Sequence, residues 1–230
     1  MFWQRKASPE NCGHALYEFL LAGLRDKAGR IRAEDFISAT ASIAGERCIE
    51  AAGILKPHDH AIAPGTRVFS DKVNTLLCGD LPNTAMADLP AASVFGMLRD
   101  RLLSEKYDLA EFPEPTAIFK GFAASIGKTE DWGKVPLSVP QDNQPNLLPL
   151  RVTYETRQKV DQLFAPLGAD SAAKLQAAVL ALAETLNAVA GVIDHKTALL
   201  LALETLNGMA KTAPMTAAAM AKAQQKPTGA

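Results

Sequence analysis

Two stretches in the C-terminal third of the chain repeat the residues Glu-Thr-Leu-Asn, which bring a carboxylate and an amide into very apolar surroundings. The copies occupy positions 184–187 and 204–207, twenty positions apart. A leucine four residues before each Glu places Leu, Glu and Asn on one face of an α-helix. We call the four polar residues the polar ridges: Glu184 and Asn187 in the first copy, Glu204 and Asn207 in the second. Because burying an unpaired charge is costly, each ridge must face water, the other ridge or a partner.

Two interpretations of the first ridge remain open. Glu184 lies opposite an apolar seam that contains Leu186, which is typical of a solvated face. The same face also carries small or apolar residues that invite close packing: Ala173, Ala177, Leu180 and Gly191. In that case Glu184 and Glu204 lie at the same height in an antiparallel hairpin and share a proton, a cation or a partner's arginine. We predict that at least one of the two carboxylates is buried and bonded, with the Asn one turn along, Lys196 or Lys211 as donor.

A second cluster of potential metal ligands consists of Glu46, Glu50, His58 and His60. The two histidines flank an aspartate in a short loop, and the two glutamates share one face of the preceding helix; imidazole and carboxylate suit a divalent transition metal. Against this, Arg47 is an ion-pair partner for Glu50, and no Cys-x-x-Cys or His-Glu-x-x-His pattern is present. The ridges are weaker metal candidates, because the residue three positions after each Glu is Asn and not His.

A thiol nucleophile has little support in the sequence. Cys12 and His14 stand two residues apart at a helix start, a spacing at which the side chains diverge. Cys48 and Cys78 are typical of small core residues, and three widely spaced cysteines do not suggest disulfide bonds. The glycine-rich nucleotide loops and the Gly-x-Ser-x-Gly elbow are absent from the sequence. The chain therefore identifies no cofactor.

The composition is that of a soluble globular chain. Of 230 residues 48% are hydrophobic, and 24 Lys and Arg stand against 25 Asp and Glu without a basic run, which argues against a nucleic-acid partner. Residues 172–193 and 197–210 each carry a Glu and an Asn near the middle, and the second is too short to span a bilayer, so we expect no membrane partner. The absence of a secretory signal pattern and the sparse cysteines predict a cytoplasmic protein.

Apolar periodicity predicts helices along most of the chain. The stretches with a helical period are residues 10–27, 33–52, 70–79, 91–103, 116–126, 154–164, 171–193 and 194–209. Residues that favour helix starts precede three of them: Ser70, Asp170 or Ser171, and Asp194. The second helix is rich in Ala, Ser and Gly, which permits the close approach of a neighbouring helix.

Residues 127–150 hold four prolines, which disfavour both helix and central strand. A flexible interdomain linker is one interpretation. An ordered arm on the surface is favoured, because the segment carries apolar side chains that a flexible linker does not need: Trp132, Val135, Leu137, Val139, Leu147 and Leu148. We predict that Trp132 and Leu148 pack on the helices or on a second subunit.

The last two helices are predicted to form a hairpin that turns between Gly191 and Asp194. Its inner faces would bury one shared set of residues: Leu182, Leu186, Val189, Leu199, Leu203 and Leu206. The alternative is a single long helix through Gly191, at a cost of about 1 kcal/mol.

The sequence as a whole predicts an all-α, multi-helix bundle with a C-terminal helical hairpin and a Pro-rich extended arm. Its predicted regions are residues 1–126 (N-terminal helices), 127–152 (Pro-rich arm or linker), 153–212 (hairpin region) and 213–230 (Ala-rich, partly disordered tail). We expect a non-enzymatic interaction or scaffold protein that self-associates as a homodimer and that can also bind another protein. The alternative is an enzyme that binds a small molecule or metal at Glu46, Glu50, His58 and His60.

Overall fold

The computed structural model describes residues 7–54, 63–80, 84–125 and 134–215. These residues form eight α-helices and four short 3-10 turns, and their one bridge of β type joins Arg67 to Thr212. The helices are α1 (Pro9–Gly23), α2 (Ala33–Ala51), α3 (Asp71–Cys78), α4 (Val94–Leu103), α5 (Pro115–Ala124), α6 (Pro149–Phe164), α7 (Ser171–Val189) and α8 (His195–Ala210). The prediction of an all-α protein is confirmed.

Helix α2 forms the centre of the molecule, and nearly its whole length is buried. Its sequence explains how other helices approach it so closely. A Cβ atom added to Gly45 would lie 2.6 Å from the carbonyl oxygen of Leu206 in α8, so glycine is needed at this crossing. The buried hydroxyls of Thr40 and Ser42 donate to carbonyls one turn earlier in the same helix, so both hydroxyl hydrogens have acceptors within α2.

Helices α7 and α8 both pack along α2 and make few contacts with each other. The six residues of α7 and α8 that were predicted to be buried together do lie in one core, together with residues of α1 to α4. The expectation that they face each other across a hairpin is wrong, because the small side chains of α2 let both helices dock on it instead. The turn after Val189 and the cap at Asp194, which accepts a hydrogen bond from the Thr197 N–H, are as predicted.

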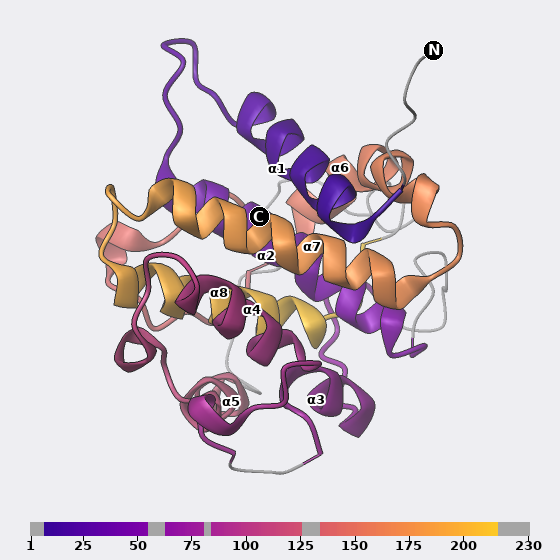
Figure 1. Cartoon of the computed structure of the whole chain (residues 1–230), viewed down its shortest axis with the longest axis vertical. Helices are drawn as coiled ribbons and strands as arrows, with labels where there is room; N and C mark the ends of the chain where they lie inside the picture. The colour runs from indigo at the N-terminus through magenta and orange to yellow at the C-terminus, as the bar shows by residue number, and fades with distance from the viewer. Residues whose placement is uncertain (1–6, 55–62, 81–83, 126–133, 216–230) are drawn as a thin grey trace, which may run out of the picture.

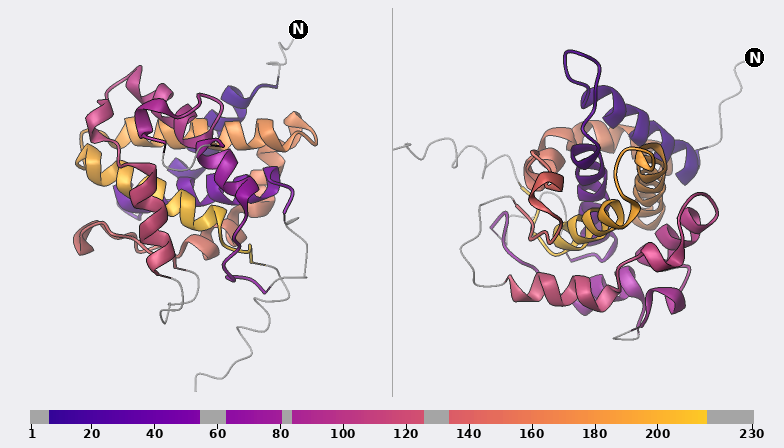
Figure 2. Two further views of the ribbon diagram at one scale, coloured as in Figure 1. Left: turned by 90° about the horizontal axis from the view of Figure 1, so that it is seen from below. Right: turned by 90° about the vertical axis from the view of Figure 1, so that its left-hand side faces the viewer.

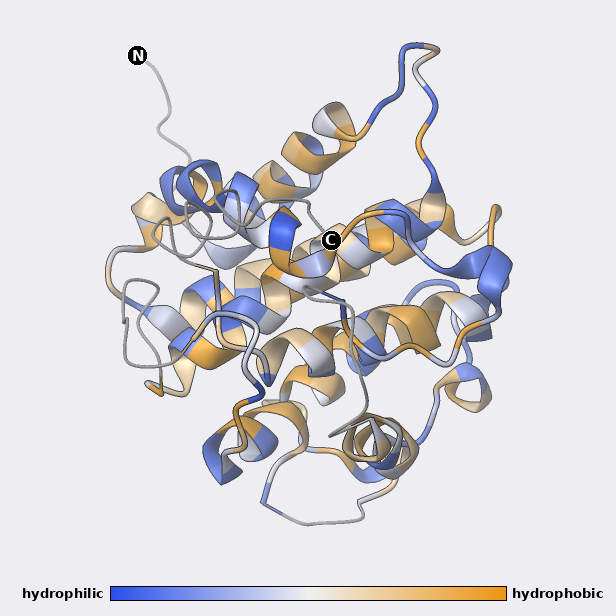
Figure 3. Cartoon of the chain, turned by 180° about the vertical axis from the view of Figure 1, so that it is seen from behind, coloured by the Kyte–Doolittle hydropathy of each residue, from blue (hydrophilic) through white to orange (hydrophobic). Residues whose placement is uncertain are grey.

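The remaining helices cover the two ends of this central group (Figures 1 and 2). Helices α1 and α6 lie at one end, and α3, α4 and α5 lie at the other. The loop between α1 and α2 projects from the body and is largely hydrophilic (Figure 3). Two helices begin more than one residue away from the predicted start: α4 at Val94, where the Ser93 side chain accepts from the Gly96 N–H, and α6 at Pro149, where proline suits the first turn.

Residues 134–148 run in largely extended form over α8 and the start of α2. Val135 and Val139 are buried, and a Cβ atom added to Gly208 in α8 would lie 2.7 Å from the Cβ of Val135. At the other end, the Asn146 N–H donates to Asp35. Leu148 is half-buried at the start of α6, while Trp132 lies outside the described residues.

One hydrophobic core joins helices of the predicted N-terminal and C-terminal regions. Within the described parts of the chain, none of the helices combines the length and apolarity that crossing a membrane requires.

Candidate functional site

The first polar ridge lies at the junction of α7 and α1. Helix α1 approaches α7 closely at Gly13, where an added Cβ atom would be 2.6 Å from the Ala177 carbonyl oxygen. About two turns further along α7, Oε1 of Glu184 lies 2.8 Å from Nδ1 of His14. The His14 side chain is 56% exposed and that of Glu184 is 38% exposed. This ridge is therefore covered in part by α1 and open to water at its carboxylate.

The second polar ridge is buried. Glu204 is 8% exposed and accepts hydrogen bonds from both the N–H and the hydroxyl of Ser138, at 2.8 and 2.5 Å. Burial raises the pKa of Glu204 above its usual range, although the two Ser138 donors lower it. The prediction that one ridge carboxylate is buried and bonded is confirmed, but its donor is Ser138 and not the neighbouring Asn, Lys196 or Lys211. The two carboxylates have separate partners, so they do not share a proton or cation.

The two ridge amides have unmet hydrogen-bonding capacity. Asn207 is 1% exposed, and neither its amide nitrogen nor its amide oxygen has a partner among the described residues. The side-chain oxygen of Asn187 is likewise buried without a donor from that part of the chain. Most buried polar groups in proteins are paired, so these amides are exceptions to a strong rule.

The predicted metal cluster is described only in part, because His58 and His60 lie outside the described residues. Glu46 is buried and receives two hydrogen bonds from Arg157, at 3.0 and 3.1 Å. Glu50 accepts from Arg47 at 2.5 Å, as its sequence neighbourhood suggested. Among the described residues no three potential ligands come together as a metal site. A metal at Glu46 would have to displace Arg157; elemental analysis of the purified protein tests this.

The cysteines lie in the core. Cys12 is buried and burial raises the pKa of its thiol, whereas His14 points its imidazole toward Glu184. Burial raises the pKa of both Cys48 and Cys78 to about 12, so these thiols stay protonated at neutral pH. None of the three is poised as a thiolate nucleophile.

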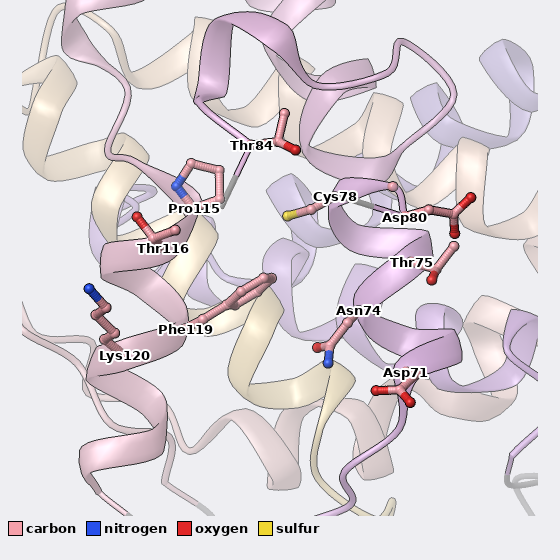
Figure 4. A pocket seen from close by; sticks show the side chains of 11 residues that line it. Asp71, Asn74, Thr75, Cys78, Asp80, Thr84, Pro115, Thr116, Phe119 and Lys120 are labelled. Atoms are coloured by element: carbon pink, nitrogen blue, oxygen red, sulfur yellow. The ribbon is translucent and has the colours of Figure 1, made fainter. Parts of the chain in front are cut away.

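A largely apolar hollow with a few polar groups lies between α3 and α5 and has a volume of about 380 Å³. Figure 4 shows Phe119 of α5 pointing into this space from one side, and Cys78 and Asn74 of α3 pointing into it from the other. The side-chain oxygen of Asn74 is buried and has no hydrogen-bond donor among the described residues. Charged residues stand at the edge, where Asp80 and Lys120 point away from the space (Figure 4). The cavity thus combines mostly apolar walls with a buried amide oxygen that has no donor among the described residues.

Lys211 lies behind this cavity, just after the end of α8. It is 5% exposed, and its ammonium nitrogen lies 3.9 Å from the ring centre of Phe119 and 5.6 Å from that of Phe122. No carboxylate pairs with it in the described residues. Burial lowers the pKa of Lys211 to about 8.

The aromatic rings do not fully compensate for the burial of this cation. Taking an ammonium out of water costs on the order of several kcal/mol per ion in a real protein. A cation held over an aromatic face recovers about 2 kcal/mol when it is desolvated. The rest of the cost of burying this charge is removed if the amine loses its proton or if an anion binds beside it. Lys211 is therefore the least satisfied charge beside the cavity.

A second hollow of about 470 Å³ lies among α1, α4 and α7 and includes Glu184 and Asn187. Its basic groups are already paired: His14 with Glu184, and Arg101 with Glu105 at 3.0 Å. These pairs are partly or largely exposed, and ion pairs in water contribute little. This hollow has less unmet charge than the cavity between α3 and α5.

The sequence reasoning missed the cavity, although part of its signal was present. Asp71, Asn74, Thr75 and Cys78 recur at helical spacing on one face of α3, and all four line the cavity. From the sequence alone, that face of the helix could have been predicted to form the polar wall of a cavity. The opposite wall, Phe119, and the position of Lys211 depend on tertiary packing and leave no local signal.

Comparison with known proteins adds nothing to this site: no family model, no curated protein and no solved structure matches the chain.

Proposed function

We propose that this protein binds a small, largely apolar molecule in the cavity between α3 and α5. The observation that carries the proposal is the pairing of a largely apolar hollow with the amide oxygen of Asn74, which has no donor among the described residues, and a buried cation, Lys211. Ligand sites are typically concave, mostly apolar and several hundred Å³ in volume, with a few polar groups that fix orientation. Groups with perturbed pKa values gather at such sites, which is true of Lys211 and Cys78 here.

A blocking substitution tests this proposal. Thr116 lines the cavity, whereas Ala117, its neighbour in α5, is exposed and does not. Thr116→Trp should fill the space, and Ala117→Trp serves as the matched control. We expect small apolar compounds, screened by ligand-observed NMR, to bind the parent and the control and to lose binding in Thr116→Trp. Equal binding to all three proteins would place the ligand elsewhere, and no binding to the parent would refute the proposal.

Self-association is a second proposal, and the segment of residues 134–148 supports it. Val135 and Val139 of this segment are buried, and Ser138 binds Glu204 of α8. The same contacts could form between two copies of the chain if the segments exchanged, which is a low-cost route to a dimer. A sedimentation mass equal to that of the monomer at micromolar concentration would contradict this proposal. If exchange occurs, deletion of residues 127–150 should release monomers.

A further inference from the structure

We infer that the ligand of the cavity between α3 and α5 carries a carboxylate, and that Lys211 is its counter-ion. This inference rests on the proposed function and names the chemical class of the molecule bound there. The ligand would place its apolar body against Phe119 and Cys78 and its carboxylate beside the buried amine.

The position of Lys211 relative to the cavity supports this assignment. Its ammonium nitrogen lies 3.9 Å from the centre of the Phe119 ring, and that ring points into the cavity (Figure 4). Cys78, which also lines the cavity, is close enough to influence the charge on Lys211. The amine therefore contacts an aromatic side chain that also lines the cavity.

The other charged groups around Lys211 leave it without a negative partner. From α2 and α3, the thiols of Cys48 and Cys78 face it in their protonated form. From α5 it meets two aromatic rings, and a second cation, Arg67, lies 5.2 Å from the Phe122 ring. At the cavity edge, Asp71 and Asp80 stand at opposite ends of α3 and do not pair with Lys211, and Lys120 adds another positive charge. Lys211 is therefore a buried amine without a carboxylate beside it among the described residues, which favours an anion as its partner.

A bound carboxylate would stabilise the protonated amine, which gives the inference a measurable consequence. In the free protein burial lowers the pKa of Lys211 to about 8, so the amine is largely neutral above that pH. An anion beside it raises the pKa again. Binding at a pH above 8 must therefore take up a proton, whereas binding well below 8 must not.

Matched pairs of compounds separate the carboxylate from the rest of the ligand. The probes are short aliphatic and phenylalkyl carboxylic acids, such as 3-phenylpropionate, each compared with its primary amide. We expect the acids to bind the parent at least about tenfold more tightly than the amides, the scale of one charge-assisted contact. Lys211→Met keeps the apolar stem and should abolish the difference. Lys159→Met, at an exposed lysine of α6 that does not line the cavity, should preserve it.

Isothermal titration of the parent in buffers of different ionisation enthalpy measures the proton uptake and does not depend on the folding of any variant. Proton uptake above pH 8 with the acids, and none with the amides, supports the inference. If acids and amides bind equally, or if only amides bind, Lys211 is not the counter-ion, while ligand binding in the cavity stands. If neither member of any pair binds the parent, and the wider apolar screen is also negative, the inference and the proposed function both fail.

Discussion

The two copies of Leu-x-x-x-Glu-Thr-Leu-Asn have the same sequence and opposite surroundings. In α7 the glutamate reaches partly exposed His14, and in α8 it is buried under residues 134–148 and bonded to Ser138. The threonines differ as well: Thr185 is hydrogen-bonded to Thr40 of α2, whereas the hydroxyl of Thr205 has no partner among the described residues. A short motif therefore determines the helix and the face, while segments distant in sequence determine what that face meets.

The motif's leucine is where the two copies should agree, and it gives the largest expected effect. Leu186 and Leu206 are both fully buried in the same core. Truncation to Ala removes buried methyl groups and leaves a cavity, so Leu186→Ala and Leu206→Ala should each lower the free energy of unfolding by about 2 to 5 kcal/mol. Urea denaturation measures both.

Val192→Ala is the control for this pair, because Val192 is 75% exposed. Its effect should stay within about 0.5 kcal/mol. An unfolding midpoint for either leucine variant that matches the parent's would show that the copy concerned is not in the core.

Substitution of the motif's threonine should change stability in opposite directions in the two copies. Thr40 already donates its hydroxyl hydrogen to the Phe36 carbonyl, so Thr185 is the donor in the bond of 3.2 Å between the two threonines. Thr185→Val loses this bond and should destabilise the protein by about 1 kcal/mol. Thr205→Val removes a buried hydroxyl without a partner and should stabilise it by about 1 to 3 kcal/mol.

Both threonine variants keep nearly the same side-chain shape, so thermal and urea unfolding report mainly on the hydroxyl. Destabilisation by Thr205→Val would mean that the hydroxyl is bonded in solution. Stabilisation by Thr185→Val would remove the contrast between the copies.

The helices of this fold were largely predictable from the sequence because their signals are local. Asp170 and Asp194 cap α7 and α8 as expected, and the apolar period fixed the buried faces of both. Helix partners are a different matter, since an apolar stripe does not specify which neighbour will cover it. The apolar stripe of helix α2 is weak, because small residues make up much of the helix. Even so, α7 and α8 both pack on α2, with Thr40 in contact with α7 and Gly45 in contact with α8.

The candidate site was less predictable for the same physical reason. The polar face of α3 is visible in the sequence, but nothing local shows that Phe119 would form the opposite wall or that Lys211 would lie behind it. The buried state of Glu204 was foreseen from the cost of an unpaired charge. Its donor was not, because Ser138 is 66 positions away and reaches Glu204 only through the fold.

The motif's glutamate provides the last and smallest contrast, a dependence of stability on pH. Burial raises the pKa of Glu204 in the folded protein above the ordinary value of 4.5. An acid whose pKa is raised on folding holds its proton more tightly in the folded state. Its contribution is therefore most favourable at low pH, and stability is lost as the pH rises from about 4.5 through the raised folded value.

Glu204→Gln cannot ionise, so this loss should be absent from the variant. When the free energies of unfolding are compared from pH 4 to pH 7, the Gln variant should gain on the parent as the pH rises, because all other titrating groups are common to both. Ser138→Ala removes a donor that lowers the pKa of Glu204, so in that protein the loss should extend to higher pH. For the partly exposed copy, Glu184→Gln should change stability at neutral pH by no more than about 0.5 kcal/mol. A constant difference between parent and Glu204→Gln across the pH range would show that the carboxylate is solvated like that of Glu184, and the contrast between the two copies would then lie in the threonines alone.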